Sequence, residues 1–289
     1  MLIDCHQHPN WHGKNGDAIV ANMDRAGIDL SWLLTWEVPE AECDPSNWRA
    51  FDPRRSGIPL EDVVQLCERH PGRFLPGYAP DPRRPDALER LEAAVEMFGV
   101  RVCGELKVRI VLDDPDAVRL FRKCGALKLP VLFHIDVPAR SRPTPPARDY
   151  WYCVDIDRLE AVLKLCPETN FIGHAPGFWR HISGDGYEPE EAYPKTPVTP
   201  GGRVPELLAK YPNLYADISA GSGLNALTRP PESQGRRFLI EFQDKVLFGR
   251  DFFDNGQFEF LKQQKLPQPV WEKITFKNAL RLVPIKPYA

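Results

Sequence analysis

Two histidines separated by a single residue, His6 and His8, lie near the start of the chain. They follow a short apolar run, Leu2-Ile3, and residues two apart on a β-strand point to the same face. Both imidazoles would then project side by side from one strand end. Two such rings can bind zinc or another divalent ion, or they can simply be hydrogen-bonded in a polar core.

Four more residues with metal-binding side chains end other β-rich apolar runs. They are Glu105, His134, His174 and Asp251. Any one of them alone is more often a structural group, but their joint placement favours a common site. Imidazoles and carboxylates together suit zinc, manganese or iron, and zinc is the first expectation where nitrogen donors dominate.

The elements that must position these residues repeat a strand-then-helix rhythm. We expect eight strands, at Leu2–His6, Leu30–Trp36, Phe74–Ala79, Val100–Val108, Val131–Ile135, Asn170–His174, Leu214–Ile218 and Val246–Phe252. Amphipathic stretches such as Leu60–Arg69 and Asp86–Met97 separate them. Eight such units predict a single α/β domain over residues 1–289, a closed (β/α)8 barrel of the TIM type with its chemistry at the C-terminal strand ends.

An open doubly wound sheet is the alternative fold, and it is disfavoured because no glycine-rich phosphate loop follows the first strand. Three long connections, Glu37–Pro59, Val137–Tyr152 and Pro176–Pro205, follow strands and would lie over the barrel mouth. Long loops of this kind are functional lids, solvated insertions or oligomer contacts.

The composition narrows the function further. No apolar run approaches the roughly 18 residues that span a membrane, and a net charge of −3 argues against nucleic-acid binding. We therefore expect a small-molecule substrate. The seven cysteines are scattered without a disulfide or CxxC pattern, and no export signal is seen, so we expect a cytoplasmic protein. Cys5 alternates with His6 and should face away from the site.

The motifs resemble the amidohydrolase superfamily, in the branch that contains the aminocarboxymuconate semialdehyde and resorcylate decarboxylases. The resemblance is carried almost from end to end by Asp4-Cys5-His6-Gln7-His8, Gly104-Glu105-Leu106-Lys107, Phe133-His134, Gly173-His174, Leu214–Ser219, Phe248-Gly249-Arg250-Asp251 and Asn278–Leu282. It implies a β/α barrel, one or two bound divalent ions and a homo-oligomer such as a dimer. By position it implies that the metal ligands are His6, His8, His134 and Asp251, with His174 binding a second ion or acting on the substrate.

Glu105 departs from the decarboxylase pattern, which usually lacks an acidic ligand on the fourth strand. In hydrolase branches of the superfamily this position supplies a carboxylate, from glutamate or a carboxylated lysine, that bridges two metals. Lys107 has the same strand parity and is the alternative ligand if carboxylated, but Glu105 needs no modification. A Glu105–Lys107 ion pair is the structural alternative.

These features predict a metal-dependent hydrolase in which metal-activated water attacks a small, carboxylate-bearing amide, ester or lactone. Asp251 would move the proton from water to the leaving group, His174 would stabilise the oxyanion or hold the second metal, and Lys107 would face an anionic substrate. The competing prediction is a metal-dependent, non-oxidative decarboxylase of an aromatic or unsaturated acid. A third is an inactive barrel with a structural metal.

Candidate substrate contacts lie in the loops that follow the strands. Arg140, Arg142 and Arg148 follow the fifth strand and Arg180 the sixth. They could clamp a carboxylate, or they could be solvated loop charges. Trp36 follows the second strand, and Trp11, Trp151 and Trp179 follow others. These rings could stack on an aromatic substrate or anchor the loops.

Overall fold

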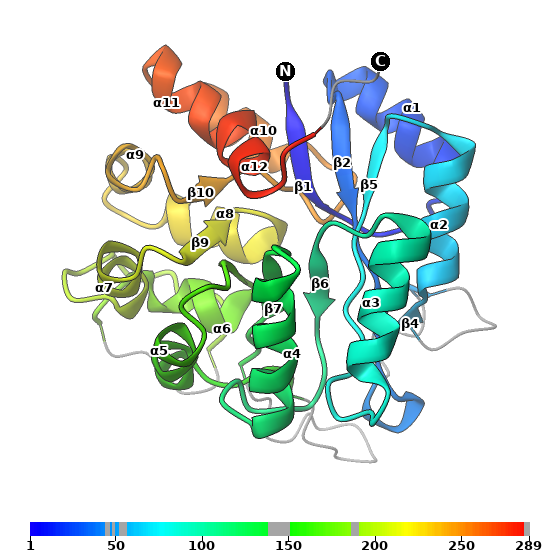
Figure 1. Cartoon of the computed structure of the whole chain (residues 1–289). Helices are drawn as coiled ribbons and strands as arrows, with labels where there is room; N and C mark the ends of the chain where they lie inside the picture. Colours follow the sequence, from blue (N-terminus) through cyan, green and yellow to red (C-terminus); the bar gives the residue numbers. More distant parts are fainter. Residues whose placement is uncertain (44–46, 48–49, 52–56, 138–150, 186–190, 286–289) are drawn as a thin grey trace.

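The structure is a computed structural model that describes residues 1–43, 47, 50–51, 57–137, 151–185 and 191–285 (Figure 1). Eight strands of the described chain build the barrel. They are β1 (Ile3–Gln7), β2 (Leu30–Leu33), β5 (Phe74–Pro76), β6 (Cys103–Leu106), β7 (Val131–His134), β8 (Phe171–His174), β9 (Leu214–Asp217) and β10 (Val246–Leu247). Each lies within or beside a run that the sequence predicts.

Two parallel arcs, β1-β2-β5 and β6-β7-β8-β9-β10, make up the sheet. A parallel bridge between Gly77 and Val102 joins the arcs on one side. On the other side Cys5 N donates to the Phe248 carbonyl at 3.0 Å. The sheet therefore closes on itself, and the predicted (β/α)8 barrel is confirmed over the open-sheet alternative.

Helices surround the strands (Figure 1). They are α1 (Gly16–Ala26), α2 (Leu60–Arg69), α3 (Ala87–Phe98), α4 (Pro115–Ala126), α5 (Ile156–Leu165), α6 (Pro176–Trp179), α7 (Arg203–Lys210), α8 (Ala220–Thr228), α9 (Gln234–Glu241), α10 (Gly256–Gln263), α11 (Gln268–Glu272) and α12 (Asn278–Leu282). Helix α2 has the predicted bounds, and α3 begins and ends one residue later than predicted. No helix in the described ranges has the length and apolarity needed to cross a bilayer.

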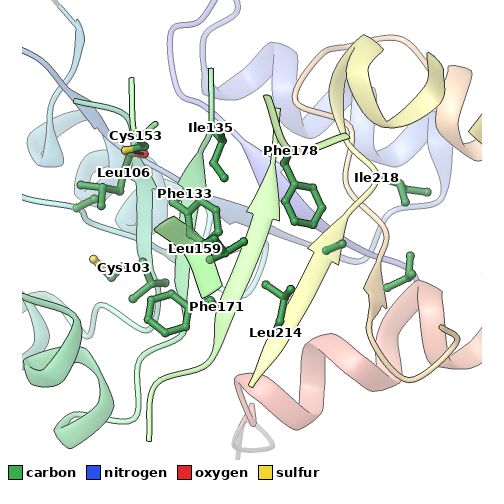
Figure 2. Packing of buried hydrophobic residues seen from close by; sticks show 14 of the residues in the cluster. Cys103, Leu106, Phe133, Ile135, Cys153, Leu159, Phe171, Phe178, Leu214 and Ile218 are labelled. Carbon is green, nitrogen blue, oxygen red and sulfur yellow. Dashed lines mark hydrogen bonds between the residues drawn. The ribbon is translucent and has the colours of Figure 1, made fainter. Parts of the chain in front are cut away.

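The alternation of strand residues divides the core in two. One set, which includes Phe133 and Phe171, packs outward against helix residues such as Leu159 of α5 (Figure 2). The other set, which includes Ile3 and Leu247, packs inside the barrel with residues of α12. Because α12 closes the end at which the strands begin, the polar strand ends lie at the opposite mouth (Figure 1).

Six of the eight predicted strands end earlier than expected, among them the second and the eighth. The second stops at Leu33 because the next residues turn toward β6, where Thr35 N donates to the Gly104 carbonyl at 3.2 Å. Trp36 lies instead in a hairpin of β3 (Trp36–Glu37) and β4 (Gly57–Ile58), inside the long connection that follows. The eighth stops at Leu247, so its polar end continues as irregular backbone.

The orientation of the Cys5 side chain also differs from the prediction. The pairing of β1 with β2 shifts register between Asp4 and Gln7, so strict alternation along β1 fails. Cys5 packs with the interior cluster instead of facing away from the site. Burial, and then the charges of Asp4 and Asp217, raise the pKa of its thiol well above the ordinary value. The thiol stays protonated, which agrees with the expectation that it is not a nucleophile.

Candidate metal centre

The first group of polar side chains forms where β1 and the segment after β10 meet. His6 Nε2 and His8 Nε2 lie 3.2 Å apart. Asp251 Oδ1 lies 3.8 Å from the first and 3.5 Å from the second. This carboxylate oxygen is buried and has no hydrogen-bond partner in the described residues. A cation among the three atoms would offset the cost of burying that oxygen unpaired, so the group fits a divalent metal.

Hydrogen bonds behind the rings orient them toward this point. Asp217 accepts from His6 Nδ1 at 2.8 Å through one oxygen and from His174 Nδ1 at 2.9 Å through the other. His8 Nδ1 donates to the Leu34 carbonyl at 2.9 Å. With each Nδ1 protonated, the Nε2 lone pairs face the centre, which is the tautomer that metal ligation needs.

Asp217, at the end of β9, is a site residue that the sequence does not predict, although it lies in one of the motifs that carry the family resemblance. Burial raises its pKa, but the adjacent His174 and His6 lower it further, and the net pKa lies well below its ordinary value. Ser219 Oγ also donates to it at 2.7 Å. Its position at a strand end, like that of the histidines, was the signal that could have found it.

Glu105 lies between two sets of rings. Its Oε2 is 3.3 Å from His8 Nε2 and 3.9 Å from His6 Nε2. Its Oε1 is 2.8 Å from His134 Nδ1 and 3.6 Å from His174 Nε2. Glu105, His134 and His174 thus form a second group of potential ligands beside the first. One carboxylate reaches both groups.

The charge states within the second group suit a cation. Burial raises the pKa of Glu105, but the charge of Lys107 and the close contacts with His134 and His8 lower it more, so the carboxylate is ionised. Burial, followed by the charge of Lys107, lowers the pKa of His134 to about 3. A neutral imidazole beside an ionised carboxylate is the donor pair that divalent zinc and manganese accept.

Lys107 sits over an aromatic wall at the mouth. Its Nζ lies 3.9 Å from the centre of the Trp36 ring and 5.7 Å from that of Tyr152. Within the ranges the structure describes, this ammonium makes no hydrogen bond or ion pair, so the alternative of a Glu105–Lys107 pair is not formed. The wall continues to Trp11, whose ring lies 6.0 Å from that of His8. A positive charge with free donors therefore lies close to the ligand groups.

The remaining predicted contacts are placed as follows. Arg140, Arg142 and Arg148 lie outside the described residues. Arg180, in the 3₁₀ turn η3 (Arg180–Ile182), is largely buried and lines a cavity of about 180 Å³ with Asp136 and His181. Trp36 is 1% exposed and packs against Phe51, an arrangement that anchors the hairpin.

The family follows from the sequence as a whole. Residues 3–285 match the model of a family described as Amidohydrolase, and the chain belongs to this family. The predicted resemblance is confirmed. Comparison with curated protein sequences gave no match.

Solved structures agree on the fold. The barrel resembles a 2,6-dihydroxybenzoate decarboxylase from Rhizobium, with 18% identity, coverage of 97% of this chain and 98% of that one, and a TM-score of 0.63. A probable 2-pyrone-4,6-dicarboxylic acid hydrolase from Acinetobacter baumannii matches at 13% identity, 97% and 98% coverage and a TM-score of 0.58. A dihydroxybenzoic acid decarboxylase from Polaromonas, with bound manganese, matches at 16% identity, 97% and 96% coverage and a TM-score of 0.58.

This protein is thus an enzyme of the amidohydrolase superfamily, whose members use a divalent metal. The similar structures include both a hydrolase and decarboxylases, so they do not choose between the two reactions. The cytoplasmic location, the single domain and the dimer stay predictions.

Proposed function

We propose that this protein is a metal-dependent hydrolase that binds two divalent ions bridged by Glu105 and cleaves a small, carboxylate-bearing amide, ester or lactone. The observation that supports it is the position of the Glu105 carboxylate. One oxygen faces His6 and His8 while the other faces His134 and His174. A bridging carboxylate between two ions is an arrangement of metal-dependent hydrolases.

The donors divide into two sets. His6, His8, Asp251 and Glu105 Oε2 would hold the first ion. Glu105 Oε1, His134 and His174 would hold the second. Nitrogen-rich donors favour zinc, and the carboxylates also suit manganese or iron. When bound, such ions lower the pKa of a water molecule toward neutrality and polarise a carbonyl group.

Asp251 is the group we assign to proton transfer. Its free Oδ1 faces the ligand atoms, and its side chain is 13% exposed, so substrate can approach it from the mouth. It accepts a proton from the attacking water and returns it to the departing nitrogen or oxygen as the acyl bond breaks. His174 acts as a ligand in this scheme, because its Nδ1 already binds Asp217 and only Nε2 faces the centre.

Lys107 is the group we assign to the substrate's carboxylate. Its ammonium is held above Trp36 and makes no hydrogen bond to the described residues, and it is close enough to Glu105 and His134 to influence both electrostatically. An anionic substrate would pair with it, and the aromatic wall would exclude water around that pair. Arg180, Arg140 and Arg142 are further candidates to bind the same substrate carboxylate. Trp36 lies beneath the Lys107 ammonium.

Decarboxylation is the second candidate, and two of the three similar structures named above are decarboxylases. The same residues would then hold a carboxylic acid while a proton replaces the departing carboxylate. The two reactions differ in their products, because only decarboxylation releases carbon dioxide.

A substrate panel tests the proposal. Zinc- or manganese-loaded enzyme is incubated with small carboxylate-bearing amides, esters and lactones and with aromatic acids, and both acid products and carbon dioxide are measured. We expect hydrolysis that chelator abolishes and that Asp251→Asn slows about a hundredfold or more. Release of carbon dioxide without any hydrolysis would replace this proposal with the decarboxylase.

A further inference from the structure

The first ligand group is assembled across the seam between β1 and the segment after β10, where the barrel closes. Asp251 N donates to the His6 carbonyl at 2.8 Å, which ties the two ligand segments together. Asp251 itself adopts φ +65°, in the left-handed region, so the chain turns sharply there. In the described chain the β10 ladder ends at Leu247. Contacts outside the sheet must therefore hold Asp251 in place.

A buried ion pair lies directly beside these ligands in the chain. Arg250 Nε donates to Asp4 Oδ2 at 2.7 Å, and both side chains are 1% exposed or less. The other oxygen, Asp4 Oδ1, accepts from His6 N at 3.2 Å and from Arg250 N at 3.0 Å. One carboxylate thus fixes the backbone next to ligands on both sides of the seam.

Amides extend this network to both neighbouring segments. Gln7 Nε2 donates to Asp4 Oδ2 and to the Phe252 carbonyl, each at 3.0 Å. Arg250 Nη1 donates to Asn22 Oδ1 at 2.7 Å and to Asn255 Oδ1 at 3.1 Å. The guanidinium therefore links β1, helix α1 and the start of α10.

We infer that Asp4 and Arg250 form a positioning clamp that sets the affinity of the first ligand group, His6, His8 and Asp251, for its ion. This inference rests on the proposed function, because it requires a metal at that group. Neither clamp residue is among the potential ligand groups, so the clamp acts through the backbone that carries the ligands.

The clamp affects the geometry of the ligands more than the stability of the protein. A buried ion pair gains little over well-packed apolar residues, because both charges lose their hydration. It does fix two chain segments in one relative position, and metal sites tolerate only small displacements of their ligands. Changes to the partners that orient ligands typically weaken metal binding by about 10-fold to 100-fold.

The second ligand group provides an internal comparison. Glu105, His134 and His174 lie on β6, β7 and β8, and within the described ranges no hydrogen bond or ion pair joins them to Asp4 or Arg250. A change at the clamp should therefore weaken the first ion and spare the second. A change that merely loosens the whole protein would weaken both.

Titration of metal-free protein with Co²⁺ tests this directly, because its visible absorption reports the geometry at each site and calorimetry reports affinity. Arg250→Lys keeps the charge but loses the planar fork of donors. We expect it to weaken one class of Co²⁺ site by about tenfold or more and to alter its spectrum, with the other class within about twofold of wild type.

A second variant and a control keep the result interpretable. Asp4→Asn combined with Arg250→Gln removes both charges, so no buried charge is left unpaired, and the same selective weakening is expected. Arg229→Lys alters another buried arginine, which lies away from the seam and pairs with Asp185 at 3.0 Å. This variant should leave both classes of Co²⁺ site unchanged.

The outcomes separate the two proposals. If both Arg250 variants fold and bind Co²⁺ as wild type does, or weaken both classes equally, the clamp is wrong and the metal proposal stands. If wild-type protein binds no Co²⁺ at all, the proposed function fails and the clamp fails with it.

Discussion

The two ligand groups at the mouth are built in different ways. On β7 and β8 the ladder is regular, and His134 pairs directly with His174 in register. At the seam, β1 shifts register, β10 ends early, and Asp251 takes a left-handed conformation. His134 and His174 of the second group therefore depend on ordinary strand pairing, although the register between β6 and β7 shifts near Glu105. The first group depends on side-chain contacts such as Asp4 with Arg250.

The largest effect should come from removing the first group. A His6→Ala, His8→Ala double variant deletes two ligands but leaves Glu105, His134 and His174 intact. We expect loss of one of the two ions and a fall in kcat/KM of about a thousandfold, which corresponds to about 4 kcal/mol of lost transition-state stabilisation. Elemental analysis and steady-state kinetics measure the two quantities. Unchanged metal content would show that the first group is not a ligand set.

A change at Asp217 should affect both groups, because its carboxylate orients His6 and His174 together. In Asp217→Asn only one oxygen remains to accept, so at least one ring loses its fixed tautomer. We expect both classes of Co²⁺ site to weaken by about 10-fold to 100-fold. Weakening of only one class would mean that Asp217 does not link them.

Lys107→Met should separate substrate binding from metal binding. The methionine keeps much of the packing over Trp36 but removes the charge. We expect KM for an anionic substrate to rise about tenfold, the loss expected for one charge-assisted hydrogen bond, with metal content unchanged. An uncharged substrate of similar size is the control and should show little change. Equal effects on both substrates would contradict the assigned role.

We expect the smallest effect on metal binding from a change at Asp185, which lies in the long connection after β8. Asp185 pairs with the buried Arg229 at 3.0 Å. Burial raises the pKa of Asp185, but hydrogen bonds from Ser183, Thr196 and Arg229 lower it from 3.8 to about 2. Because the folded pKa is depressed, the pair stabilises the protein above about pH 4 and loses this effect as the pH falls toward 2.

We therefore expect Asp185→Asn to lower the free energy of unfolding at pH 7 by about 1–3 kcal/mol while both metal classes bind normally. The difference in Tm from wild type should shrink as the pH approaches 2. A difference that is constant across this range would show that the ionised carboxylate is not responsible.

Much of the architecture could be predicted because its signals are local. Apolar runs bounded by polar residues located all eight strands, and periodicity gave α2 its exact ends. The six residues predicted as ligands, including Glu105 and Asp251, do converge at one mouth. Strand order along the chain suffices for this, since parallel strands bring their C-terminal ends together.

The features that the sequence did not predict correctly depend on contacts between segments that are distant in the chain. The register shift that turns Cys5 inward arises from pairing with β2, which strict alternation along β1 cannot reveal. Trp36 reads as the end of a strand, but the hairpin with β4 withdraws it from the barrel. Asp217 gains its role only when β9 brings it behind two rings that are 168 residues apart in the chain, His6 and His174.

The number of metal ions per chain is the most direct test of this account. Elemental analysis of protein purified without chelator, and then reconstituted with zinc or manganese, should give about two ions per chain, and the Glu105→Gln variant should hold about one or fewer because the bridge is lost. One ion per chain in both proteins, or none after reconstitution, would contradict a bridged pair at Glu105.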